Sequence, residues 1–280
     1  MKYGFVLPYG DARTAAEIAH QAEEAGWDGF FVSEPVWGID AWVSLAAAAM
    51  RTERIRLGTM LSPLSRMRPW KLASESATLD NLSNGRVIIS VGLGAVETGF
   101  EAFGEIVDRK TRAELLDEGL EILTGLWRGQ PFRHDGKHYR IKETDFSPPP
   151  PPVQQPRIPI WVAAAWGSEK SMRRALRCDG LLPQVLKPKR DGTREARQAS
   201  QKDLRAMRAY VEANRTGASP FDIVVEGQTP GHDHARAAST VRAWSDAGAT
   251  WWIEAMWDVL AKSGGMDALR KRLNQGPPRL

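Results

Sequence analysis

Residues 87–92 read Val-Ile-Ile-Ser-Val-Gly, a short and almost continuous apolar run that ends in glycine. A strand of a parallel sheet reads this way, because helices cover one of its faces and the protein core covers the other. Similar runs alternate with helix-like stretches along the chain, and the full set is Tyr3–Leu7, Asp28–Ser33, Ile55–Met60, Val87–Gly92, Pro159–Ala164, Gly180–Gln184, Phe221–Glu226 and Thr250–Ala255. Strict strand–helix alternation, repeated eight times, favours a closed (β/α)8 TIM barrel over an open sheet.

Length and composition agree with one barrel. The 280 residues show no change of composition along the chain, so we expect a single domain over residues 1–280. One cysteine, Cys178, excludes an internal disulfide framework and suits a reducing cytoplasm, where we expect the protein to work. No N-terminal segment has the pattern of a signal peptide, and no apolar stretch approaches the ~18 residues of a membrane span.

The charge pattern of the chain bears on which partners it could bind. The formal net charge is +4, but basic and acidic residues are interspersed and no basic stripe is interleaved with aromatic residues. Nucleic-acid binding is therefore not expected. Basic residues concentrate only in Lys187–Arg205, which reads either as a solvated loop and helix face or as a region that attracts an anionic cofactor or substrate.

One segment interrupts the alternation, between the fourth predicted helix and the fifth predicted strand. His134-Asp-Gly-Lys137 reads as a tight turn between Pro131–Arg133 and His138–Ile141, which predicts a β-hairpin. Pro148–Pro152 then requires extended backbone that donates no hydrogen bonds. We expect an insertion made of this hairpin and a Pro-rich strap across the face opposite the chemistry. The alternative is a polyproline ligand for another domain.

Candidate functional residues follow the predicted strands, because the reacting groups of a (β/α)8 barrel lie at the C-terminal ends of its strands. Tryptophans stand at three of these ends: Trp37, Trp166 and Trp257. With few ionisable groups beside them, they suit a large flat ring system better than a sugar or a polyanion. The other candidates there are Pro8, Glu34, Thr59, Met60, Gly92, Gly94, Glu97, Gly167 and Ser168.

Several chemistries lack a matching pattern. There is no His-x-x-x-His pair, cysteine cluster or Asp-rich loop, so no metal site is expected. No serine stands in a Gly-x-Ser-x-Gly frame. Gly92-Leu-Gly94 only weakly resembles a dinucleotide fingerprint, since Glu97 replaces the third glycine. Gly92 and Gly94 either let a flat ligand lie against the backbone or satisfy a turn at the barrel rim.

Gly167-Ser168 offers a phosphate site. The pair follows a predicted buried strand and opens a helix, so backbone N–H groups and the positive end of the helix dipole point towards the mouth of the barrel. Ser168 could also be a simple N-cap, and both roles can hold together.

Many sequence blocks occur in a fixed order along the chain: Ile55-Arg-Leu-Gly-Thr59, Arg68-Pro69, Ala77–Arg86, Val91-Gly-Leu-Gly94, Leu116–Leu123, Leu126–Gly129, His134-Asp-Gly136, Ile158–Val162 and Cys178-Asp-Gly180. Together they closely resemble the luciferase-like superfamily of flavin-dependent monooxygenases and oxidoreductases. The resemblance implies an eight-stranded barrel with an insertion that binds reduced FMN or the deazaflavin coenzyme F420 at its C-terminal face.

The resemblance also implies where the cofactor lies. Thr59-Met60 matches the place where many members have a non-proline cis peptide behind the isoalloxazine ring. Gly92 and Gly94 match strand-four glycines near the cofactor, and Gly167-Ser168 matches the loop that takes its phosphate. Pro8 and Trp166 complete the expected cofactor-binding set.

The expected catalytic residues are Glu34, Trp37 and Glu97. Glu34 and Trp37 match the loop over the reactive ring, and Glu97 lies near an acid that some F420-dependent members use. Such members often have an Asp-His pair where this chain has Glu34-Pro35, which weakens the F420 interpretation. A glutamate in an apolar mouth has a raised pKa and can transfer a proton; the alternative is an ion pair with Arg66 or Arg68 that holds the loop shut.

The leading hypothesis is a flavin-dependent monooxygenase that uses reduced FMN and O2 on a small organic substrate. The alternatives are an F420-dependent hydride-transfer enzyme and a non-catalytic flavin-binding barrel. A flavin reductase could supply the reduced cofactor. We also expect a homodimer or larger homo-oligomer, since the third predicted helix carries apolar residues such as Trp70 and members of the superfamily pair on this side.

Overall fold

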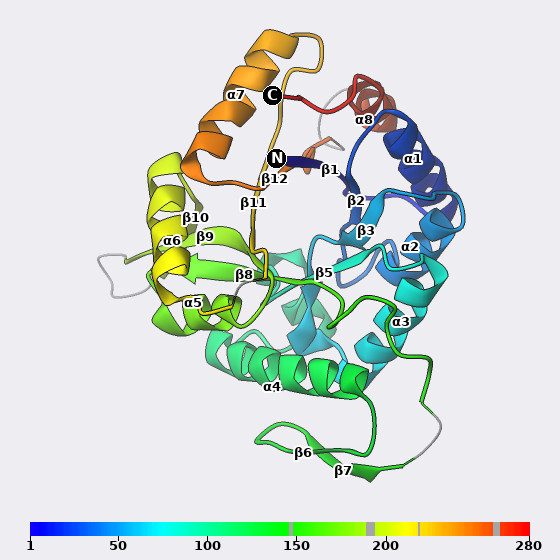
Figure 1. Cartoon of the computed structure of the whole chain (residues 1–280), viewed down its shortest axis with the longest axis vertical. Coiled ribbons are helices and arrows are strands. Elements are labelled where there is room, and N and C mark those ends of the chain that lie inside the picture. Colours follow the sequence, from blue (N-terminus) through cyan, green and yellow to red (C-terminus); the bar gives the residue numbers. More distant parts are fainter. Residues whose placement is uncertain (146–147, 189–193, 218, 260–263) are drawn as a thin grey trace. The chain divides into compact units, whose positions relative to one another are not determined.

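The computed structural model describes residues 1–145, 148–188, 194–217, 219–259 and 264–280 (Figure 1). Strands and helices alternate along the chain as in a (β/α)8 TIM barrel, and this predicted fold class is confirmed. The chain divides into two compact units: unit 1 comprises Met1–Pro8, Ile18–Phe31 and Ile160–Leu280, and unit 2 comprises Tyr9–Glu17 and Val32–Pro159. A single domain over residues 1–280 stays a prediction.

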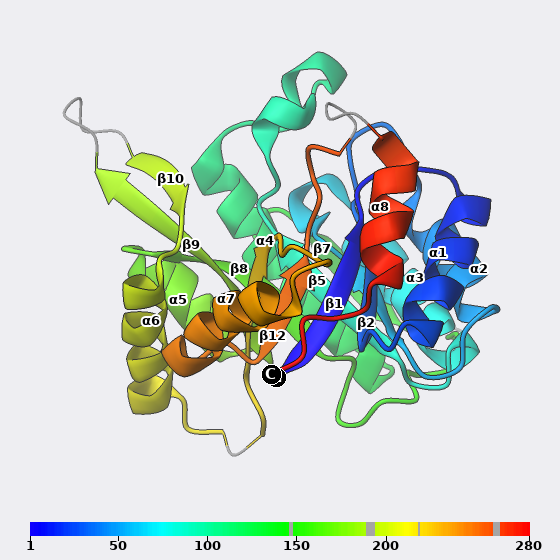
Figure 2. The same ribbon diagram turned by 90° about the horizontal axis from the view of Figure 1, so that it is seen from above.

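Unit 1 contains a mainly parallel sheet. Its strand order is β8 (Ile160–Trp166), β9 (Gly180–Pro188), β11 (Asp222–Gly227), β12 (Trp251–Glu254) and β1 (Lys2–Leu7). The register places Trp252 beside Val225 on one side and Tyr3 on the other. β10 (Arg194–Gln198) pairs antiparallel with β9 on the outer edge (Figure 2). Sequence analysis missed β10, because Arg-Glu-Ala-Arg-Gln has no apolar alternation, and the basic segment Lys187–Arg205 was expected to be only loop and helix.

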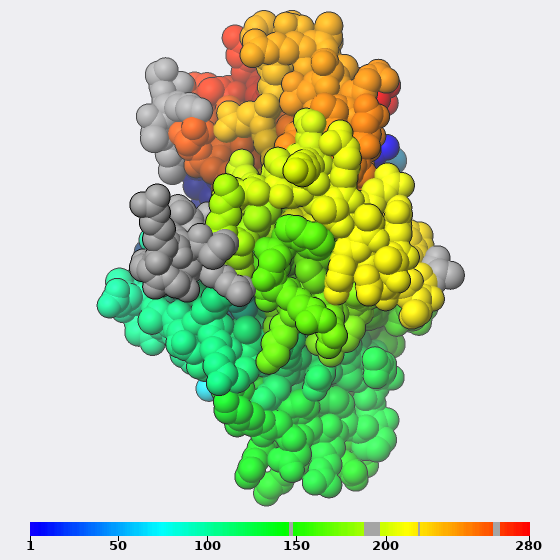
Figure 3. Space-filling view, turned by 90° about the vertical axis from the view of Figure 1, so that its left-hand side faces the viewer, coloured from blue at the N-terminus to red at the C-terminus, as the bar shows by residue number. Residues whose placement is uncertain are grey.

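Two helices of unit 1 begin at side-chain caps. α6 (Gln201–Asn214) has a reciprocal capping box between Ser200 and Asp203, and the Asp233 side chain caps α7 (His234–Ala247). Figure 3 shows α6 and α5 (Glu169–Leu176) on the surface of unit 1. The remaining helices with residues in this unit are α1 (Ala12–Glu24) and α8 (Gly265–Asn274).

Tryptophans fill the core of unit 1. Trp161 and Trp251 meet edge to face with ring centroids 5.2 Å apart, and Phe31 contacts both rings. Trp27 packs against Phe5 and donates its indole N–H to the carbonyl of Leu273 in α8 at 3.0 Å. Several of the eleven tryptophans are therefore structural, which accounts for much of the aromatic content without a ligand.

Unit 2 carries the strands β3 (Arg56–Thr59), β5 (Val87–Gly92) and β4 (Ser62–Pro63), of which β3 and β4 each pair parallel with β5. β2 (Gly29–Val32) is buried throughout and ends in this unit, where the carbonyl of Val32 accepts the N–H of Met60 at 2.9 Å. The helices are α2 (Ala41–Ala49), α3 (Pro69–Leu82) and α4 (Arg109–Arg128). Asp40 and Asp108 cap α2 and α4, and proline opens α3.

The predicted insertion is present. The hairpin consists of β6 (Phe132–Asp135) and β7 (Arg140–Thr144) and packs on α4 (Figure 1). Beyond the proline run, Gln154 donates its side-chain amide to Asp80 of α3 at 2.7 Å and to the carbonyl of Val87 at 2.8 Å. Val87 begins β5, so this part of the insertion lies at the end of the strand away from its C-terminal residues, as expected for a strap.

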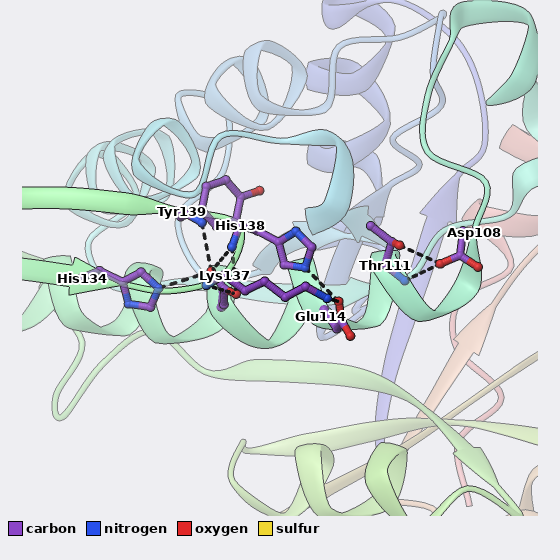
Figure 4. A network of polar contacts seen from close by, with 8 residues as sticks. Asp108, Thr111, Glu114, His134, Lys137, His138 and Tyr139 are labelled. Atoms are coloured by element: carbon purple, nitrogen blue, oxygen red, sulfur yellow. Dashed lines mark hydrogen bonds and ion pairs between the residues drawn. The ribbon is translucent and has the colours of Figure 1, made fainter.

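A polar network joins the hairpin to α4 (Figure 4). Glu118 accepts the backbone N–H groups of Lys137, His138 and Tyr139 at 2.9–3.1 Å. Burial raises the pKa of Glu118. Hydrogen bonds from the backbone N–H groups of residues 137–139 and from the His134 side chain lower it by more, so the pKa lies below its usual value. Lys137 and His138 hold the pKa of Glu114 at about 2. His134 and His138 therefore have a structural role.

We expect Glu118→Ala to loosen the hairpin. The loss of a carboxylate that accepts from three backbone N–H groups should cost about 2 kcal/mol or more. Amide hydrogen exchange at Lys137–Tyr139 should accelerate by about 30-fold. The stabilisation is present above the pKa that Glu118 has in the unfolded chain and is lost as the pH falls through its lower folded value. Glu121→Ala, an exposed change on the same helix, is the matched control and should leave this exchange unaltered.

Candidate functional site

In unit 2, Glu34 follows β2, and its carboxyl contacts the hydroxyl group of Ser62 at the start of β4, which in turn contacts Thr59 at the end of β3. Ser62 Oγ forms a very short hydrogen bond with Glu34 Oε2 and lies 2.9 Å from Thr59 Oγ1. Thr59 Oγ1 in turn donates to the carbonyl of Ser90 in β5 at 3.3 Å. Thr59, Ser62 and Ser90 are buried, so strand C-terminal ends in this unit hold one continuous polar chain.

Burial raises the pKa of Glu34 to about 7, and the hydrogen bond from Ser62 and the charge of Arg66 only partly oppose this. The negative charge of Glu75 raises it a little further. The desolvated carboxyl therefore changes its protonation state near neutral pH, which is the property expected of a group that transfers protons.

Arg66 positions the loop that carries Glu34. Its Nη2 atom donates to the backbone carbonyls of Glu34 and Pro35, each at 3.2 Å, and its guanidinium lies over the Phe100 ring. In the described part of the chain the Glu34 carboxyl makes no ion pair with Arg66 or Arg68. Arg66 fixes the backbone of the loop, and its charge also acts on the Glu34 carboxyl, so the alternative role for Glu34 or Glu97 stays a prediction.

Gly92 and Gly94 lie at and just after the end of β5, and protein atoms crowd Gly94. Gly94 has φ +76°, and a Cβ atom there would meet Phe100 at 2.7 Å and Pro63 at 2.9 Å. Its missing side chain serves close packing and an unusual turn. Gly92 ends β5 and is buried. Arg112 donates to the carbonyls of Leu93 and Gly94, which fixes this turn from α4.

The expected cis peptide is present one bond later than the pair named from the sequence. It joins Met60 and Leu61, between β3 and β4. Met60 is buried, and Thr59 contributes its hydroxyl to the Glu34 chain.

In unit 1, Gly167 and Ser168 join β8 to α5. Gly167 has φ +90° and is exposed, and Ser168 occupies the N-cap position without a side-chain capping bond. Glu169 is the acidic residue of the first turn, and its carboxylate pairs with Arg173 at 2.6 Å. The exposed glycine and the uncapped helix start fit a phosphate group. Trp166, the last residue of β8, stacks edge to face on Tyr210.

Two further carboxyl groups end strands of unit 1. Glu226 of β11 accepts the indole N–H of Trp257 at 2.8 Å, and burial raises its pKa although this bond lowers it. Glu254 of β12 is fully buried and binds Thr229, Trp252 and Arg272. The partners of Glu254 are complete, so it is structural, whereas Glu226 is a candidate that sequence analysis missed. Its signal was a glutamate that directly follows the apolar residues Ile223–Val225 of β11.

The remaining predicted residues are Trp37, Glu97 and Pro8. Trp37 is 84% exposed, and Glu97 is exposed in a 3-10 turn. Pro8 directly follows β1. Among the described residues, no group of three or more His, Cys, Asp or Glu side chains could hold a metal ion.

The model of the luciferase-like monooxygenase family matches residues 2–275, so the chain belongs to that family. A Mycobacterium tuberculosis protein named, provisionally, as a coenzyme F420-dependent oxidoreductase is 33% identical over 207 residues, which is 69% of this chain and 58% of that protein. The oxygenase component of the flavin-dependent trigonelline monooxygenase of Acinetobacter baylyi is 34% identical over 123 residues, 44% of this chain and 33% of that protein. The chain thus matches less than two thirds of the length of either relative.

Among solved structures, the coenzyme F420-dependent tetrahydromethanopterin reductase of Methanopyrus kandleri is similar with a TM-score of 0.76. The match covers 99% of this chain and 98% of the reductase, at 16% sequence identity. At this identity the likeness concerns the fold.

Proposed function

We propose that the protein is a flavin-dependent monooxygenase that uses reduced FMN and O2 on a small organic substrate. The observation that carries the proposal is the desolvated Glu34 carboxyl after β2, which has a pKa of about 7 and a hydrogen bond to the Ser62 hydroxyl, itself in contact with Thr59. The bound cofactor would supply the electrons, and the chain's own residues would hold it, exclude water and move a proton.

The proposal assigns the residues as follows. Glu34 transfers the proton, and Trp37 and Glu97 belong to loops that would cover the substrate. Gly167, which is exposed, and Ser168, which is half-buried, would take the cofactor phosphate. The remaining cofactor-binding residues are Pro8, Thr59, Met60, Gly92, Gly94 and Trp166.

The second candidate is an F420-dependent hydride-transfer oxidoreductase, favoured by the named relative from M. tuberculosis. Against it stands Pro35, which occupies the place where a histidine was expected after the acid. Titration of the purified protein with reduced FMN and reduced F420, followed by fluorescence quenching, distinguishes the two. Tight binding of F420 alone would reverse the order. Binding without cofactor oxidation against any substrate would favour a non-catalytic flavin-binding barrel.

We further propose a cytoplasmic enzyme that receives reduced flavin from a separate reductase. In the described residues, no helix is long and apolar enough to cross a membrane.

We predict that the protein is a homodimer or a larger oligomer. Exposed apolar side chains gather on two consecutive helices of unit 2: Val43 and Met50 at α2, and Trp70 and Leu82 on α3. Light scattering should give a mass of at least about twice the 31.1 kDa of one chain. Met50→Glu should shift the mass towards the monomer, whereas Val153→Glu, at an exposed apolar site outside these helices, should not. A monomeric mass for the unaltered protein would refute the prediction.

A further inference from the structure

The hydroxyl chain beside Glu34 has a direction. A hydroxyl group donates one hydrogen bond, and a carbonyl oxygen only accepts. The chain ends at the carbonyl of Ser90, which accepts from Thr59. If Thr59 donates there, it can accept from Ser62, and Ser62 can then accept from a protonated Glu34. All members are satisfied in this order when Glu34 is neutral.

The same atoms also satisfy the ionised form. When Glu34 is a carboxylate, Ser62 donates to it instead, and Thr59 turns from the Ser90 carbonyl to donate to Ser62 at 2.9 Å. An arginine or amide N–H could serve only the carboxylate, because it cannot accept the acid proton. A buried hydroxyl pair therefore gives the Glu34 carboxyl a partner in both protonation states, and in the ionised state the Ser90 carbonyl gives up its hydrogen bond from Thr59.

We propose that Ser62 and Thr59 are positioning residues that partner both protonation states of Glu34, and that their hydroxyl groups reverse direction each time the proton moves. In the forward step the O–H bond of Glu34 breaks and its proton forms a new bond to a basic oxygen or nitrogen atom of the bound substrate. Ser62 then donates to the new carboxylate, and Thr59 donates to Ser62. A proton from solvent water restores Glu34 and the first orientation.

Other groups around Glu34 keep one charge throughout this cycle. Arg66 of the turn after β4 contributes positive charge, and Glu75 of α3 contributes negative charge. Trp42 of α2 is close enough to lower the Glu34 pKa slightly, although its indole N–H has no hydrogen-bond partner of normal geometry among the described residues. Among the described groups around Glu34, only the hydroxyl groups of Ser62 and Thr59 can switch between donating and accepting when Glu34 changes its protonation state.

The test is the midpoint of Glu34 ionisation in the cofactor-free protein, measured from the carboxyl infrared bands that Glu34→Gln abolishes. Ser62→Ala removes a bond that stabilises the carboxylate more than the acid. The midpoint should therefore rise by about one pH unit above its value near 7. Thr59→Val, which keeps the shape of the side chain, should raise it less. Ser62→Thr should restore it.

Ser65→Ala is the matched control. Ser65 lies three residues further along the chain, and its buried hydroxyl has no hydrogen-bond partner in the described structure. It should leave the midpoint and the pH profile of turnover unchanged. An unmoved midpoint in both Ser62→Ala and Thr59→Val would overturn the proposal, and Thr59→Val alone decides if Ser62→Ala does not fold.

This inference rests on the proposed function only in assigning the proton transfer of Glu34 to catalysis. A shifted midpoint with no turnover in any variant would refute the proposed oxidoreductase while upholding the hydroxyl pair. Where turnover is measurable, the acid–base limb of kcat should move by the same amount as the infrared midpoint. A merely structural role would lower kcat without moving that limb.

Discussion

Replacing Glu34 by glutamine should lower turnover on the order of 100-fold while leaving cofactor affinity unchanged. Glutamine keeps the size of the side chain and its capacity to bind Ser62, but it cannot gain or lose the proton. Steady-state kinetics and cofactor titration of the same preparation separate the two quantities. Glu101→Gln, an exposed change in the 3-10 turn before α4, is the control. Unchanged turnover would show that water or the cofactor carries the proton.

The same substitution should stabilise the fold above neutral pH. Because the pKa of Glu34 is raised from 4.5 to about 7, the folded protein binds more protons than the unfolded chain between these values. Its free energy of unfolding therefore falls as the pH rises through this window, by up to about 3 kcal/mol. In the glutamine variant the side chain does not ionise, so the free energy of unfolding should not show this fall. Urea denaturation at pH 5 and pH 8 should show the difference, and a variant no more stable than the parent at pH 8 would contradict the buried acid.

Gly167→Asp should weaken cofactor binding by at least about tenfold, or about 1.4 kcal/mol. The aspartate would place negative charge at the exposed start of α5, where a phosphate is proposed to dock. The φ of +90° also strains any residue with a side chain, so some loss of stability is expected. Gly167→Asn has the same shape and tolerates this backbone conformation better, without the charge.

The comparison of these two variants isolates electrostatic repulsion from strain. Aspartate should bind the cofactor more weakly than asparagine, and the difference should shrink at high salt. Equal affinities would place the phosphate elsewhere, with Lys187–Arg190 as the next candidate, of which residues 189 and 190 lie outside the described part of the chain.

Sequence periodicity was sufficient for the scaffold. Val87–Gly92 was predicted with its observed bounds, because a strand buried on both faces is apolar at nearly every position. β10 was missed for the opposite reason: its charged residues carry no periodic signal, and its pairing with β9 is a tertiary property. The hairpin was recognisable from the turn His134–Lys137. Its anchoring on Glu118 was not, since that glutamate lies in the preceding helix α4 and its contact with the turn depends on how the hairpin folds back.

For the candidate site, residue types were predictable and their partners were not. Glu34 was named from its place after a strand, yet its link to Ser62 depends on how the chain turns after Met60. Gly94 was interpreted either as room for a flat ligand or as a turn at the barrel rim, and the contacts with Phe100 and Pro63 that favour the turn were not foreseen. Neither contact follows from spacing, because each joins residues from separate loops.

The pairing of β1 with β12 has a consequence for biosynthesis. Lys2–Phe5 aligns with Trp251–Glu254, so β1 leaves the ribosome about 250 residues before the strand with which it pairs. At about 5–20 residues per second, this delay lasts roughly 12–50 s. During that time an apolar segment lacks its native neighbour and is open to aggregation or to chaperones. Yield in a heterologous host should therefore depend on translation speed and chaperone supply.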